Sequence, residues 1–114
     1  MGLISIFRDT KIAGELHKAA AEINEYTYDM CKILDRYNDF ANFSSYDKCQ
    51  IHDYLRKISN KSDWMYKRMQ DLAPDHVFIT KVPCMDGSMT SVVGYVMAVK
   101  TQVEQFKNEL NGYI

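Results

Sequence analysis

The chain has 114 residues, enough for one hydrophobic core and therefore for a single domain over residues 1–114. Its 14 basic residues nearly balance its 15 acidic ones, and the formal net charge is −1. A charge this close to zero excludes a strong overall attraction to nucleic acid or to an anionic membrane, so such binding would need a local patch. The sequence contains no run of about twenty apolar residues, and we expect no transmembrane segment.

The first predicted helix is marked by apolar residues that recur at alternating intervals of four and three. This spacing averages close to the period of the α-helix, so the residues form one seam along it. The pattern predicts a helix capped at its start by Asp9 or Thr10 and preceded by a short apolar segment, Leu3–Phe7. We expect that segment to dock on the helices, with a membrane surface as the alternative. The seam residues are Ile12, Leu16, Ala19, Ile23, Tyr26, Met30, Ile33, Tyr37 and Phe40.

A second seam predicts a helix from about Tyr46 to Ala73. Ser44, followed three residues later by Asp47, resembles a capping box at its start, and Pro74 is expected to end it. The residues between 59 and 62 are poor helix formers or strongly solvated, which predicts a kink there, or a restart of the helix with Ser62 as its cap. The seam residues are Ile51, Leu55, Ile58, Ser62, Met65, Met69 and Leu72.

A third seam predicts a helix that begins near Met89 and ends with a cap at Gly112. Its residues are Val92, Val96, Val99, Val103, Phe106 and Leu110. The β-type composition of residues 77–82 and the turn signal Asp86-Gly87 leave a β-hairpin over residues 77–99 as an alternative. We favour loop plus helix because the seam stays in phase to its end.

Together the seams predict an all-α fold, a small antiparallel helical bundle of three main helices with coiled-coil-like packing. The first helical segment is predominantly acidic and the second predominantly basic, which favours an antiparallel hairpin of these two. Helices this long surround only a small core, so we also predict self-association as a homodimer.

The three cysteines, Cys31, Cys49 and Cys84, are widely spaced and form no C-x-x-C pair. This excludes the common zinc-knuckle and thioredoxin-type motifs and indicates a reducing, cytoplasmic compartment. Cys84 follows Pro83 in a predicted loop, and its role stays open.

The sequence contains no recognisable catalytic or metal-binding pattern. The three histidines, His17, His52 and His76, are far apart and lack the spacing of a helical metal motif, so we expect them on the surface. A glycine-rich phosphate loop is also missing from the sequence. We therefore predict no enzymatic activity, no cofactor, and neither catalytic nor metal-binding residues.

The strongest candidate for a binding site is a row of residues off the seam of the second helix, here called the basic-aromatic stripe. Tryptophan, tyrosine and arginine are enriched at protein hot spots, so the stripe predicts a non-enzymatic protein–protein interaction module: an adaptor, inhibitor or assembly subunit. The partner cannot be named from the sequence. The stripe consists of Tyr54, Lys57, Lys61, Trp64 and Arg68.

Three other interpretations of these features stay open. Basic and aromatic residues on one face also suit nucleic-acid binding, although the near-neutral charge of the chain argues against it. The apolar segment at residues 3–7 would suit a peripheral membrane protein. The third helix or a second copy of the chain could instead simply cover the stripe.

Overall fold

The structure, a computed structural model, describes residues 3–110, apart from the side chains of residues 3–6 and 40. This part of the chain is mostly helical, as predicted, with four α-helices, one 3-10 turn and a small two-stranded sheet. The elements in chain order are α1 (Leu3–Leu34), η1 (Phe40–Asn42), α2 (Ser45–Met69), α3 (Pro74–Val77), β1 (Lys81–Pro83), β2 (Met89–Ser91) and α4 (Val92–Leu110).

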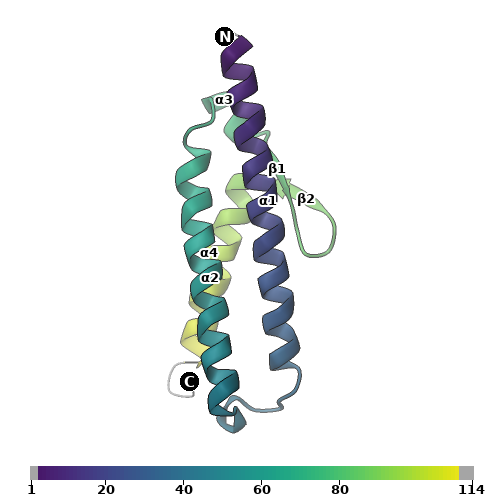
Figure 1. Ribbon diagram of the computed structural model, residues 1–114, viewed down its shortest axis with the longest axis vertical. Coiled ribbons are helices and arrows are strands. Elements are labelled where there is room, and N and C mark those ends of the chain that lie inside the picture. The colour runs from purple at the N-terminus through teal and green to yellow at the C-terminus, as the bar shows by residue number, and fades with distance from the viewer. Residues whose placement is uncertain (1–2, 111–114) are drawn as a thin grey trace.

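The long helices give the molecule its elongated shape, 57 × 23 × 19 Å. Helices α1 and α2 lie side by side and run in opposite directions, and α4 packs along α2 (Figure 1). The β1–β2 hairpin lies against α1, and α3 is found at the end of the molecule where α1 begins. The structure thus adds a short helix and a hairpin to the three predicted helices.

The three seams form the core. In the described part of the first seam, every residue from Ile12 to Ile33 is buried except Tyr26, which is half-buried together with Tyr37. All seven residues of the second seam are buried, and the third is buried apart from half-buried Phe106. Full burial of one aliphatic side chain stabilises a fold by about 1.5–3 kcal/mol. The seam assignment is confirmed, and one chain is sufficient to bury these residues.

Helix α1 begins earlier and ends earlier than predicted. It starts at Leu3, so Asp9 and Thr10 lie inside the helix and do not cap it. Asp9 is instead buried: its carboxylate accepts the Ala73 N–H at 3.3 Å and contacts Nδ1 of His76. His76 is therefore half-buried and engaged, which corrects the expectation of a solvated surface residue. Helix α1 then ends at Leu34, and the chain turns before reaching residue 40.

Helix α2 confirms the predicted cap and corrects the predicted restart at Ser62. The Ser44 hydroxyl accepts the Asp47 N–H at 3.1 Å. The helix is continuous from Ser45 to Met69, because the packing of buried residues such as Ile58 and Met65 outweighs weak local propensity. It ends before Ala73, and Pro74 begins α3. Since the N–H groups of the first helical turn have no partner within the helix, the lack of an N–H in proline does not destabilise α3 there.

Residues 77–99 combine the two alternatives. A hairpin is present, but its strands are only three residues long, with Val82 opposite Thr90. Gly87 adopts a φ of 88° at the turn, where the Asp86 carboxylate accepts the Ser88 N–H at 2.9 Å. The predicted start of the last helix at Met89 is wrong: the helix begins at Val92, because the Ser91 hydroxyl caps it by accepting the Gly94 N–H at 3.1 Å. The predicted cap at Gly112 lies outside the described residues.

A buried polar junction fixes α4 and the hairpin to α1. The Tyr95 hydroxyl lies 2.6 Å from Oδ1 of Asn24 and 3.1 Å from the Ala20 carbonyl oxygen. Asn24 in turn donates its Nδ2–H to the Pro83 carbonyl of β1 at 2.9 Å. Burial, assisted by nearby Cys84, raises the pKa of Tyr95 far above its ordinary value, so its hydroxyl keeps its proton. Cys84 is half-buried beside the core and does not lie free in an exposed loop.

We predict that Ile23→Asp or Ile58→Asp abolishes cooperative thermal unfolding. An unpaired buried carboxylate costs several kcal/mol, which approaches the total stability of about 5–15 kcal/mol of a typical domain. Circular dichroism melting curves measure the effect. Asn60→Asp, which adds the same charge at an exposed position of α2, should melt like the parent protein. A parent-like melt of either isoleucine variant would contradict the core described here.

Candidate functional site

The basic-aromatic stripe lies along the edge of α2 that faces α1. Three of its residues, Tyr54, Lys61 and Arg68, are half-buried, whereas Lys57 and Trp64 are exposed. Their spacing predicted a face of α2 that lies off the seam, with no contact to the first helix. Instead they form a surface shared with α1.

Two ion pairs connect the stripe to the acidic face of α1. Arg68 Nε donates to Glu15 at 2.8 Å, and Lys61 contacts Glu22. The earlier α1 residue meets the later α2 residue, as antiparallel neighbours require. The hydrogen bond from Arg68 lowers the pKa of Glu15, and Glu15 together with Asp71 raises the pKa of Arg68, so both groups are charged at neutral pH. The predicted pairing of an acidic with a basic helix is visible in these contacts.

At the other end of the stripe, Lys57 lies beside a pair of aromatic rings. Its ammonium group is 5.7 Å from the ring centre of Tyr26 on α1 and 5.8 Å from that of Tyr54. The two rings are themselves 6.4 Å apart. Lys57 also pairs with Asp53 at 3.1 Å, and hydrogen bonds from Arg56 and Lys57 lower the pKa of Asp53. Ring faces attract cations, so these contacts hold the lysine in place.

Between these contacts α1 and α2 enclose a shallow groove of about 510 Å³. Buried Ala19 is the smallest side chain lining it, and its size leaves room between the helices. Trp64, 43% exposed, lies toward one end and Tyr26 toward the other. The lining residues are Glu15, Lys18, Ala19, Glu22, Tyr26, Lys57, Asn60, Lys61 and Trp64.

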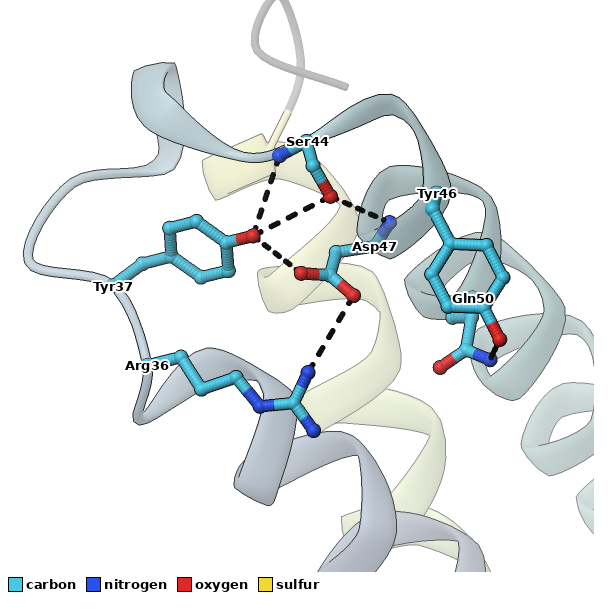
Figure 2. Close-up of polar contacts among 6 residues, drawn as sticks. All are labelled: Arg36, Tyr37, Ser44, Tyr46, Asp47 and Gln50. Atoms are coloured by element: carbon cyan, nitrogen blue, oxygen red, sulfur yellow. Dashed lines mark hydrogen bonds and ion pairs between the residues drawn. The ribbon is translucent and has the colours of Figure 1, made fainter.

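A second polar cluster secures the turn between the two helices (Figure 2). The Tyr37 hydroxyl accepts the Ser44 N–H at 3.3 Å and contacts the buried carboxylate of Asp47, while Arg36 approaches that carboxylate at 3.7 Å. The rings of Tyr37 and Phe43 lie 4.3 Å apart. Since these contacts join the end of α1 to the start of α2, they hold the walls of the groove in alignment.

The described residues form few other candidate sites for catalysis or metal binding. A larger hollow of about 740 Å³ between α2 and α4 has Cys49, His52 and Asp53 among its lining residues. However, no group of three or more histidine, cysteine, aspartate or glutamate side chains within residues 3–110 is arranged to hold a metal ion. The three cysteines are free. No helix in the described part of the chain combines the length and apolarity needed to cross a bilayer.

Comparison with known proteins gives no further guide to the site. The sequence matches no protein-family model, and neither a curated protein nor a solved structure matches it. The α1 half of the groove was missed by sequence reasoning, although the opposite charges of the two helical segments pointed toward it. Nothing in the sequence alone marks Ala19, Glu22 or Tyr26 as binding residues.

We predict that Trp64, the only tryptophan, emits as a solvent-exposed indole and is readily quenched by iodide. Because a large part of its ring reaches solvent, Trp64→Ala should cost well under the roughly 3–5 kcal/mol lost when a buried tryptophan is removed. Fluorescence quenching and urea unfolding measure these two quantities. A blue-shifted, unquenched Trp64 in the isolated monomer would show that the ring is covered.

Proposed function

We propose that this protein is a non-enzymatic protein–protein interaction module that binds its partner through the groove between α1 and α2. The observation that carries the proposal is the placement of Trp64, a large aromatic side chain left partly exposed beside a groove between two charged helices. Aromatic anchors of this kind supply much of the affinity of protein interfaces.

The surroundings of Trp64 support such a role. The Glu15–Arg68 and Glu22–Lys61 pairs border the groove and restrain long side chains before any partner arrives. Restraint in the free protein lowers the entropy lost on binding. Exposed Lys18 lies at the same groove. The fitting partner is therefore a helix or loop that offers one apolar side chain to Trp64 and a carboxylate to Lys18.

The same contacts argue against nucleic acid as the partner. Each cation of the stripe already has a carboxylate beside it: Lys57 has Asp53, Lys61 has Glu22, and Arg68 has Glu15. A phosphate backbone would have to displace these carboxylates or bear their repulsion. Three engaged cations offer much less attraction than three free ones.

The test begins with a photoreactive amino acid in place of Lys18, which captures proteins that touch the groove in the native host. For a captured partner, Trp64→Ala should lower affinity by about 2 kcal/mol or more, as central aromatic anchors do. Tyr66→Ala is the matched control, because Tyr66 is 40% exposed, only two residues away, and packs with Lys100 of α4. Equal losses for the two variants would contradict a site at the groove. A salt-sensitive shift of mixed DNA and RNA by the protein would favour the nucleic-acid alternative instead.

The homodimer stays a prediction. The seams are buried within one chain, so they do not by themselves demand a second copy, and the exposed apolar residues are the remaining reason to expect one. Static light scattering at micromolar concentration should give twice the 13.3 kDa mass of the chain. A mass of one chain across that range would rule the homodimer out.

A further inference from the structure

One end of the molecule exposes three large apolar side chains, here called the apolar end. They are Phe7 on α1, 67% exposed, and Phe78 and Ile79 just after α3, 74% and 67% exposed. Exposure of two phenylalanines and an isoleucine to this extent is unfavourable in water, and their placement at the same end of the molecule points to an interaction. Among the described large apolar side chains, only Tyr46 is as exposed, and it lies by the turn at the opposite end.

Specific contacts hold the two segments that carry these residues, the start of α1 and the region of α3, at the same end of the molecule. The carboxylate of Asp9 joins α1 to the Ala73 N–H and to His76 at the start and centre of α3. Arg8, the residue after Phe7, donates to the Asp71 carbonyl. In Figure 1 α3 accordingly lies beside the first turns of α1. The apolar end is thus held by the fold and does not arise from a loose segment.

The composition of this end favours a lipid surface. A few apolar side chains can enter the acyl boundary of a bilayer while neighbouring cations stay at the headgroups. Two exposed residues close in sequence to these apolar side chains, Arg8 after Phe7 and Lys81 after Ile79, supply cations of this kind.

Charge at this end does not oppose contact with headgroups. Of the nearby carboxylates, Asp9 is engaged by His76 and Asp71 by Arg68, and Asp75 is the remaining one among the described residues. The residues before Phe7 in α1 are Leu3, Ile4, Ser5 and Ile6, a mostly apolar sequence that continues the same end. We propose that the apolar end binds the surface of a phospholipid bilayer by inserting Phe7, Phe78 and Ile79. This inference stands apart from the groove and does not depend on the proposed function.

Flotation of the full chain with vesicles of phosphatidylcholine and phosphatidylserine tests the proposal. The parent protein should float with the vesicles, and Phe78→Asp or Ile79→Asp should reduce the partition coefficient at least about tenfold, since a carboxylate does not enter the acyl boundary. Tyr46→Asp is the matched control, because it adds the same charge at an equally exposed aromatic position at the far end. It should leave flotation unchanged.

Melting curves of all variants check that the fold is kept, and Phe78→Ser with Ile79→Ser replaces any aspartate variant that fails to fold. The proposal is overturned if the parent protein stays with the unbound fraction, or if Tyr46→Asp reduces flotation as much as the apolar-end variants do. It is also overturned if the parent does not float but forms dimers that Phe78→Asp dissociates, since the apolar end would then bind a second copy of the chain.

Discussion

The alignment between α1 and α2 is the constraint on which the rest of the structure depends. Apolar seams with a heptad repeat can be buried in more than one alignment, because a slip of seven residues brings apolar side chains together again. The ion pairs of Glu15 with Arg68 and of Glu22 with Lys61 both form in one alignment only, because a slip of seven residues would keep a single pair of this kind. The contact of Tyr37 with Asp47 at the turn favours the same one. Polar contacts at the edge thus select among arrangements that the core alone would accept.

The third long helix is positioned by different means. Its buried valines determine which face of α4 points toward the core. Because these valines are similar in size and shape, they determine less well how far α4 is shifted along its own axis. The hydroxyl of Tyr95 fixes the position of α4 along its axis by contacting Asn24 of α1, which also donates to the Pro83 carbonyl of the hairpin. A tyrosine hydroxyl is protonated at neutral pH and burial raises the pKa of Tyr95 further, so the junction is insensitive to pH over the physiological range. A buried polar group here specifies position more than it adds stability.

Local information made the seams and the cap at Ser44 predictable, since both depend on residues within a few positions of each other. The predicted restart of the helix at Ser62 is wrong because tertiary burial overrides weak propensity. The start of α1 was misjudged because Asp9 suits a helix cap and a buried long-range contact equally well from sequence alone. The α1 side of the groove and the placement of α3 beside the start of α1 could not be foreseen. Each depends on residues that only the folded chain brings together.

Helix α1 is the one element that takes part in nearly every long-range polar contact of the described chain. Asp9 holds α3, Glu15 and Glu22 hold α2, and Asn24 holds the hairpin and α4. Most of these contacts therefore depend on the integrity of this one helix. A protease that cut α1 once near its middle would separate the anchor of α3 from the anchors of α4 and of the turn, and neither half could keep the whole assembled. Resistance to digestion therefore rests on how rarely this one helix opens, and not on an average over all the elements.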